Sequence, residues 1–158
     1  TPRYFFAFQH TSVSQDFTHQ QSVLNAPAIL YNRRMSYPCD DVERYNDYHR
    51  LHGNPAPYTH AINKDTLRDL TRPAFDFQAA HPDKTVWCGE FGTIRHADIT
   101  SRENWMRDVI SLLKEHEMPY CVWNYLSTPN DGNRFSLVDD DTREILSPEL
   151  LRIIQGNV

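Results

Sequence analysis

The sequence predicts an α/β fold with a parallel sheet covered by helices, and three observations support this prediction. Three short segments are rich in aliphatic and aromatic strand formers, at residues 3–9, 85–90 and 120–123. Segments 63–80 and 100–117 carry apolar residues at helical spacing. Strands and helices therefore alternate along the chain, which is typical of parallel sheets. Three strands are few for such a sheet and would leave both edges open, so the pattern looks like the last part of a larger fold.

Composition and charge limit the classes of function. The 158 residues are enough for one domain with a hydrophobic core, and 39% apolar and 12% aromatic residues indicate a globular protein. The net charge is -5, and no cluster of basic residues exceeds a pair such as Arg33 and Arg34. This argues against nucleic acid and anionic membranes as partners. No apolar run approaches the roughly 18 residues of a membrane span.

The N-terminal third is the least regular part of the sequence. Residues 3–9 are almost continuously apolar and aromatic, as a strand covered on both faces should be. A start directly on such a strand suggests that the natural chain began earlier. Residues 10–60 predict a long loop region, punctuated by prolines, that includes short helices around 20–25 and 41–51.

The two clearest helices follow this region. Residues 63–80 predict a helix that Pro73 should kink or break, because proline lacks the amide hydrogen and crowds the preceding turn. Residues 100–117 predict a second helix, in which Thr100 is the N-cap and Glu103 completes a capping box.

The C-terminal segment predicts an exposed turn and a short final helix. The acidic residues at 139–142 lack the later ligands of a calcium loop and predict a solvated turn. Ser147 is the expected N-cap of the last helix, Pro148 its first residue and Gly156 its end.

The cysteines and most histidines give no sign of a metal site. Three cysteines at wide spacing form neither a disulfide framework nor a zinc motif. Cys88 and Cys121 fall in predicted strands, where we expect buried free thiols. Three further histidines in the irregular region lack metal-ligand spacing: His49, His52 and His60.

Three chemically distinct side chains follow the three predicted strands. His10 follows the first, Glu90 follows the second and Trp123 closes the third. In parallel sheets, ligands bind at these carboxyl ends. A carboxylate can attack an anomeric carbon, a histidine can orient that carboxylate, and an indole offers a flat face to a sugar ring. Gly89 and Gly92 bracket Glu90, which lets the backbone bend and another molecule approach it closely.

At this point the chain resembles the clan-A glycoside hydrolases of the family-5 cellulase type, which are (β/α)8 barrels. Residues 86–92, VWCGEFG, are similar to the strand-seven segment of that family. Residues 123–125, WNY, are similar to its strand-eight segment. Residues 17–20, FTHQ, resemble a run after strand six in a subset of these enzymes. Residues 135–139, FSLVD, and residues 144–151, EILSPELL, resemble the sequence with which the family's barrel ends.

The resemblance implies a fold and a set of site residues. The chain would be a single partial barrel over residues 1–158, made of the last three βα units. Glu90 would be the catalytic nucleophile, and His10 would orient it or the substrate. Trp123 would line the sugar subsite at the cleavage point, with Ser12 and Tyr125 as further substrate contacts. The resemblance implies neither a metal nor an organic cofactor, and it slightly favours an extracellular or periplasmic location.

The chain departs from the family pattern in two respects. The family has a tyrosine two residues after the strand-six histidine, where this chain has Ser12. Either the shorter hydroxyl acts with a water, or Tyr31 or Tyr37 supplies the tyrosine, or activity is altered. The family's general acid/base glutamate also lies upstream of strand six. A retaining glycosidase needs two carboxyls about 5 Å apart. Asp16, Asp98 and Asp131 are present in the chain, but nothing beyond their presence supports the acid/base role, and we assign it to none of them.

The sequence therefore predicts a retaining hydrolase of β-1,4-linked glucan in which this chain supplies the nucleophile half. Its partners would be an oligo- or polysaccharide and a complementary N-terminal barrel fragment or precursor segment. The alternative is a non-catalytic sugar-binding or barrel-assembly fragment. With 158 residues, against a minimum of roughly 200 for such barrels, the isolated chain should associate with a complement or be poorly stable. A closed monomer in light scattering would contradict this expectation.

Overall fold

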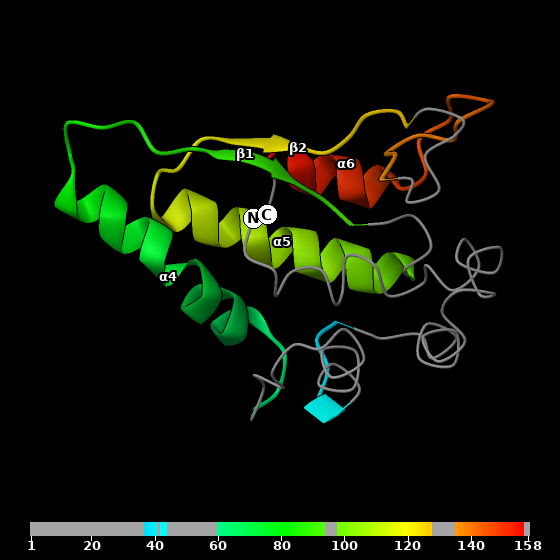
Figure 1. Ribbon diagram of the computed structural model, residues 1–158. Coiled ribbons are helices and arrows are strands. Elements are labelled where there is room, and N and C mark those ends of the chain that lie inside the picture. Colours follow the sequence, from blue (N-terminus) through cyan, green and yellow to red (C-terminus); the bar gives the residue numbers. More distant parts are fainter. Residues whose placement is uncertain (1–36, 41, 44–59, 94–97, 128–134, 157–158) are drawn as a thin grey trace, which may run out of the picture.

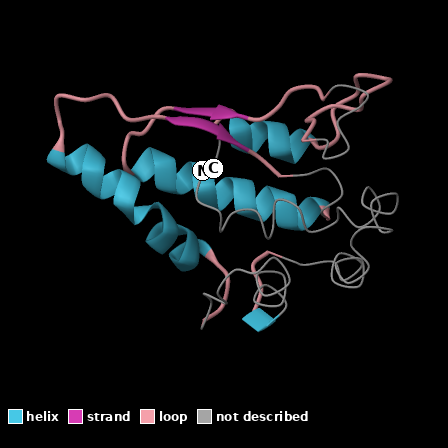
Figure 2. Cartoon of the chain, viewed as in Figure 1, coloured by secondary structure: helices cyan, strands magenta, loops and turns pink. Residues whose placement is uncertain are grey.

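The computed structural model describes residues 37–40, 42–43, 60–93, 98–127 and 135–156. Their elements are α4 (Lys64–Ala80), β1 (Cys88–Phe91), α5 (Ile99–Glu115), β2 (Tyr120–Val122) and α6 (Pro148–Ile154). Figures 1 and 2 show the two strands side by side, with α5 running along them and contacting both α4 and α6. The mixed α/β architecture is confirmed for this part of the chain. The predicted first strand at 3–9 and most of the loop region at 10–60 lie outside the described residues.

The two strands form a parallel pair with one irregularity. Cys88 lies opposite Tyr120, and Phe91 lies opposite Val122. Three steps along β1 therefore match two steps along β2, so the register shifts by one residue within β1. The amide of Trp123 donates to the carbonyl of Phe91 at 2.7 Å and extends the pairing beyond β2. β1 begins later than the predicted strand at 85–90, because the residues before Cys88 make no ladder with β2. β2 begins at Tyr120 as predicted and ends at Val122, one residue early.

The core lies between the sheet and α5. Trp105 is 1% exposed and its ring lies 6.2 Å from that of Phe91, which joins the helix to β1. The ring of Tyr120 packs edge-on against Phe91 at 5.8 Å. Burying each large apolar side chain stabilises the fold by about 1.5–3 kcal/mol, so α5 is the main support of the sheet. Six other fully or nearly fully buried residues of α5 and α6 complete this core: Met106, Ile110, Leu112, Leu113, Leu150 and Ile153.

Helix α4 runs unbroken through Pro73, so the predicted break is wrong. Its N-terminus is a capping box. The Asn63 side chain accepts from the Thr66 amide, and the Thr66 hydroxyl accepts from the Asn63 amide. Leu67 and Phe75, one on each side of the proline, are 3% and 5% exposed. The burial of both side chains stabilises the helix on either side of Pro73, which offsets the missing amide donor.

The start of α5 also differs from its prediction. Asp98 is the N-cap, and its Oδ1 accepts from the Ser101 amide at 3.0 Å. Thr100 lies inside the first turn, so the predicted capping box is wrong. The Glu103 carboxylate instead accepts from the Ser147 hydroxyl at 2.7 Å and ties α5 to the start of α6. Aspartate and threonine both cap helices well, and the prediction did not consider Asp98.

The predicted C-terminal turn and helix are confirmed. The Oδ1 of Asp139 accepts from the amides of Asp141 and Thr142, each at 3.0 Å, which is the geometry of an Asx-type turn. Ser147 caps α6 by accepting from the amide of Leu150 at 3.0 Å, and Pro148 is the first residue of that helix. Beyond the helix end, Gly156 has φ +84, a left-handed conformation that favours glycine.

The cysteines differ in exposure. Cys88 is half-buried and Cys121 is exposed, so the expectation of two buried thiols is wrong for Cys121. Cys88, Tyr120 and Val122 pack toward the core, and alternation along a strand directs Cys121 to the opposite face of the sheet. Burial raises the pKa of the Cys88 thiol. Within the described residues, no group of three or more potential ligands is arranged to hold a metal ion.

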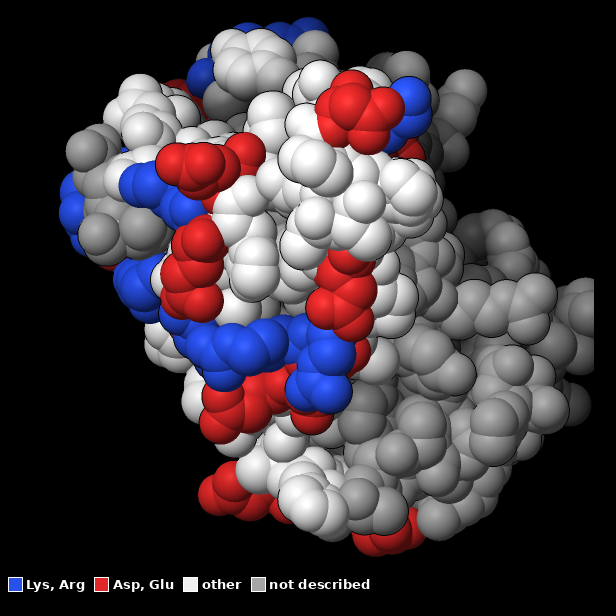
Figure 3. All heavy atoms as spheres, turned by 90° about the vertical axis from the view of Figure 1, so that its left-hand side faces the viewer, with Lys and Arg blue, Asp and Glu red and all other residues white. Residues whose placement is uncertain are grey.

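Charged side chains on α4 and α5 are arranged in pairs. Figure 3 shows basic side chains bordered by acidic ones on the face that includes α4. Lys64 contacts Glu115 at 2.7 Å, and this hydrogen bond lowers the pKa of the Glu115 carboxyl. Arg68 and Arg72 pair with aspartates three residues earlier on α4. None of the described helices is both long enough and apolar enough to cross a membrane.

The lowered pKa of the Glu149 carboxyl should make the stability of the fold depend on pH. It accepts hydrogen bonds from Arg152 and Arg107, and these, Arg152 foremost, lower its pKa from 4.5 to about 2. A lowered folded-state pKa stabilises the fold above pH 4.5, and this contribution is lost as pH falls toward 2. We expect Glu149→Gln to lower the melting temperature at neutral pH and this difference to shrink across that acid range. Thermal unfolding against pH measures it; a difference that does not change with pH would contradict the expectation.

Candidate functional site

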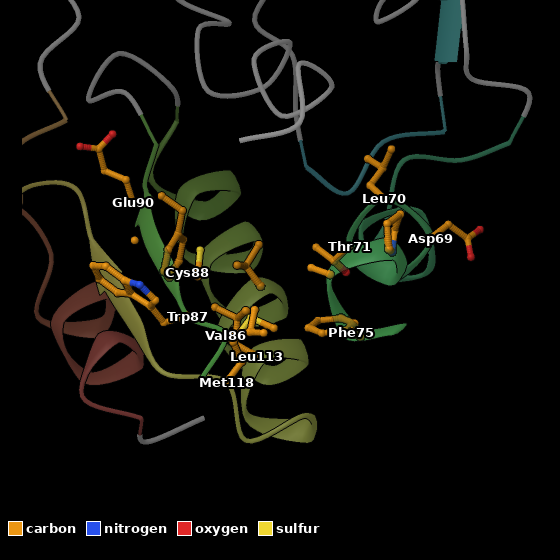
Figure 4. A pocket seen from close by; sticks show the side chains of 15 residues that line it. Asp69, Leu70, Thr71, Phe75, Val86, Trp87, Cys88, Glu90, Leu113 and Met118 are labelled. Atoms are coloured by element: carbon orange, nitrogen blue, oxygen red, sulfur yellow. The ribbon is translucent and has the colours of Figure 1, made fainter. Parts of the chain in front are cut away.

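Glu90 stands at the register shift of β1. Gly89 and Glu90 together occupy the space between two ladder positions that Cys121 alone spans on β2. Such an extra residue bends a strand and changes the direction of the side chain beside it. The Glu90 side chain is exposed, and Figure 4 shows its carboxylate pointing away from α4. The shift therefore presents a carboxylate to solvent at the carboxyl end of the strand.

The two glycines that bracket this carboxylate have different roles. A Cβ added to Gly92 would lie 1.9 Å from the carbonyl oxygen of Trp123, so only glycine lets these two main-chain segments meet. A Cβ added to Gly89 would lie 3.6 Å from the ring of Trp87, at ordinary contact distance. The close approach predicted for the glycines is therefore made at Gly92, and the group that approaches belongs to the chain itself.

Two aromatic side chains lie at the same end of the sheet. Trp123 directly follows β2 and is 46% exposed, and Tyr125 is 65% exposed. Their backbone is held from behind by the Leu137 amide, which donates to the carbonyls of Asn124 and Tyr125 at 3.2 Å each. Because β1 and β2 are parallel, Glu90 and these aromatic residues lie at the same edge of the sheet, where the carboxyl ends of both strands meet. The structure thus brings together three of the five predicted site residues.

The other predicted residues lie outside the described part of the chain. These are His10 and Ser12, together with Tyr31. The Tyr37 hydroxyl donates to the Asp108 carboxylate at 2.7 Å, and the residue is 2% exposed against α5. Because the Tyr37 hydroxyl is bonded to α5, Tyr31 is the remaining candidate for the family tyrosine that Ser12 replaces. Asp98, one of the aspartates present by count, is the N-cap of α5.

A buried polar group behind the site was missed by sequence reasoning. Arg102, in the first turn of α5, is 3% exposed and donates to Thr93 and to the Ser136 carbonyl. The Ser136 hydroxyl in turn accepts from the amide of Ser127 at 2.9 Å. Arg102 precedes the buried residues Trp105, Met106 and Val109 by three, four and seven positions, so helical spacing places it on the buried face of α5. This spacing is the signal in the sequence that indicates its burial.

A groove of about 990 Å³ opens between α4 and β1. Its walls are mainly apolar and come from α4, β1, α5 and the segment before β2. Glu90 and Trp87 are among the residues that border it, but Figure 4 shows their side chains directed away from the α4 wall. The Glu90 carboxylate therefore does not point toward the α4 side of the groove. Side chains on its facing walls include Leu70, Phe75, Val86, Leu113 and Met118.

Comparisons with known proteins agree with the motifs. Endoglucanase C of Acetivibrio thermocellus is 34% identical over 145 residues, which is 87% of this chain. Endoglucanase C307 of Clostridium sp. strain F1 gives the same values. A solved structure described as a glycoside hydrolase is 30% identical over 68% of the chain, with a TM-score of 0.50. The chain resembles part of a family-5 cellulase. No family model matches this cellulase-like chain.

The cellulase-like chain spans only part of these relatives. The aligned region covers 39% of each endoglucanase and 35% of the solved glycoside hydrolase. The resemblance stated from the motifs is confirmed at this level. The roles of individual residues remain predictions, because a relationship over part of a protein does not assign them.

Proposed function

We propose that the chain supplies the nucleophile half of a retaining glycoside hydrolase that cleaves β-1,4-linked glucan. One observation carries the proposal: an exposed carboxylate, Glu90, and an exposed indole, Trp123, stand at the same edge of a parallel sheet. The Trp123–Phe91 hydrogen bond of 2.7 Å and the close contact at Gly92 keep them there. The endoglucanase names of the relatives support the choice of substrate.

The chemistry follows the general route of retaining glycosidases. The Glu90 carboxylate attacks the anomeric carbon and forms a glycosyl ester, while an acid from the complementary part of the protein protonates the leaving oxygen. Water then cleaves the ester and restores the carboxylate. Trp123 provides the face on which the sugar ring stacks. His10 is proposed to orient the nucleophile, and Ser12 and Tyr125 to contact the substrate.

The fold proposal is a single partial (β/α)8 barrel over residues 1–158, comprising its last three βα units. The groove between α4 and β1 supports it, because its apolar walls fit the apolar predicted strand at residues 3–9. The opposite face of the sheet supports it as well. Trp87 is 57% exposed there and Cys121 is exposed, so this face is suited to contact the interior of a complementary barrel fragment.

A chimaera tests the proposed function. The region of Acetivibrio thermocellus endoglucanase C aligned with this chain is replaced by the chain, so that the relative supplies the rest. We expect hydrolysis of a soluble β-1,4-glucan, with the β-anomer as the first product in proton NMR because two displacements retain configuration. A folded chimaera that releases the α-anomer first would contradict the nucleophile role of Glu90. A folded chimaera without hydrolysis would contradict the enzymatic proposal.

The alternative of a sugar-binding fragment is favoured by one observation, the exposed pair of Trp123 and Tyr125. Aromatic faces bind sugars without any carboxylate. The same chimaera distinguishes the two proposals. Quenching of tryptophan fluorescence by cello-oligosaccharides without release of reducing ends would favour the binding role.

A further inference from the structure

We propose that Arg102 is a positioning residue that fixes the segment carrying Glu90 relative to the segment carrying Trp123. This inference rests on the proposed function for its catalytic consequence, whereas its structural part stands on the described contacts alone. Arg102 belongs to α5, the helix that supports the sheet, and its side chain is 3% exposed. Its guanidinium reaches two loops that are far apart in the sequence.

The first loop is the turn that follows Glu90. The Nε of Arg102 donates to the Thr93 hydroxyl at 3.1 Å, and Thr93 is itself 3% exposed. Thr93 directly follows Gly92, whose contact with the Trp123 carbonyl leaves no room for a side chain. A displacement of Thr93 would therefore be transmitted to the main chain two and three residues earlier, where Glu90 stands.

The second loop lies behind Trp123. The Nη2 of Arg102 donates to the Ser136 carbonyl at 3.4 Å, and Ser136 is fully buried. The Ser136 hydroxyl accepts from the Ser127 amide at 2.9 Å and donates to the Asp140 carboxylate at 2.6 Å. The Ser127 hydroxyl accepts from the Phe135 amide at 3.1 Å. These bonds close the loop that begins at Trp123.

The shape of the guanidinium explains why arginine suits this position. Its donors are fixed in one plane, so two acceptors on different loops are held at a set separation. A lysine ammonium is a point charge on a flexible stem and would not hold the same separation. The helix itself does not favour a cation here, because the first turn of a helix carries partial positive charge. The position of Arg102 is thus accounted for by the loops and not by α5.

Retaining catalysis depends on the distance between nucleophile and bound sugar. Misplacement by about 1 Å can lower a rate on the order of 100-fold even when the altered residue does not touch the substrate. Trp123 holds the sugar and Glu90 attacks it in the proposed reaction. A residue that fixes both segments therefore affects the chemical step more than substrate binding.

The experiment compares three variants. Arg102→Lys keeps the charge but removes the planar set of guanidinium donors. Thr93→Val removes one acceptor at nearly constant volume. Arg107→Lys is the matched control, because Arg107 lies on the same helix and bonds Asn104 and Glu149 instead. Amide hydrogen exchange is measured on the folded chimaera, because the isolated chain is expected to be poorly stable. Steady-state kinetics are measured on the chimaera with soluble β-1,4-glucan.

We expect local loosening without global unfolding. In Arg102→Lys the amides of Trp123, Ser127 and Phe135, which are bonded within this assembly, should exchange about tenfold faster or more. The amide of Ile110, inside α5, should change by less than about threefold. Thr93→Val should act in the same direction with a smaller effect, and Arg107→Lys should leave the three loop amides unchanged. In the chimaera, Arg102→Lys should lower kcat on the order of 100-fold with KM within about threefold.

Each contrary result has a defined meaning. Unchanged exchange at the three loop amides in Arg102→Lys would overturn the proposal. Equal acceleration at Ile110 would overturn it too, since Arg102 would then act only on overall stability. Normal kcat in an active chimaera would overturn the catalytic part. An inactive wild-type chimaera contradicts the proposed function, and the exchange result still decides the link between the two segments.

Discussion

Glu90→Gln is expected to lower kcat of the chimaera on soluble β-1,4-glucan by more than about a thousandfold. Glutamine has nearly the same size and can occupy the same exposed position at the register shift. Its amide is a far weaker nucleophile and cannot form the glycosyl ester. The fold should therefore persist while the first displacement fails. Because the proposed stacking of the substrate on Trp123 is unaffected, the dissociation constant for cello-oligosaccharides should stay within about threefold.

Glu117→Gln is the matched control for that substitution. Glu117 is an exposed carboxylate beyond the end of α5 and away from the sheet edge. Its replacement removes one negative charge but should leave kcat unchanged. Reducing-end assays measure the rates, and fluorescence titration measures binding. Equal rates in Glu90→Gln and wild type would remove Glu90 from the nucleophile role.

Gly92→Ala is expected to destabilise the chain by about 3 kcal/mol or more. The added methyl group would lie 1.9 Å from the Trp123 carbonyl oxygen and 3.3 Å from the Phe135 ring. The first contact is with backbone, which cannot turn aside as a side chain can. The two segments would have to separate, and the Trp123–Phe91 hydrogen bond would weaken with them.

Gly89→Ala provides the comparison, because it introduces the same methyl group three residues earlier in the same segment. The nearest atoms to that methyl would belong to the Trp87 ring, at 3.6 Å, so a change below about 1 kcal/mol is expected. Urea unfolding of both variants and wild type gives the free energies. Equal destabilisation by the two substitutions would contradict the role assigned to Gly92.

Sequence reasoning located the residues that depend on strand order. Glu90 and Trp123 were identified because each follows an apolar segment, and parallel pairing brings such strand ends together. The roles of Ser147 as N-cap and Pro148 as first helical residue were also predicted, since capping needs only a local pattern. The capping prediction is confirmed, because one short segment carries its whole physical cause. The roles of Glu90 and Trp123 stay predictions.

Features that depend on tertiary packing were not predictable. Asp98 caps α5 in place of Thr100, and α4 continues through Pro73, because contacts with other elements decide between local alternatives. The extra residue beside Glu90 appears only when β1 is aligned with β2. The hydrogen-bond partners of Arg102 lie in two loops that are 43 residues apart (93 and 136) in the sequence. In each case the deciding partner is distant in the chain.

The contact between Gly92 and Trp123 has a consequence for protein engineering. Main-chain atoms make it, through a glycine on one side and a carbonyl on the other. Exchanging the side chains of Trp123 or Tyr125 leaves those atoms in place. The aromatic surface can therefore be redesigned while the carboxylate keeps its place. In the proposed enzyme, the residues that contact the sugar and the nucleophile could thus be varied separately.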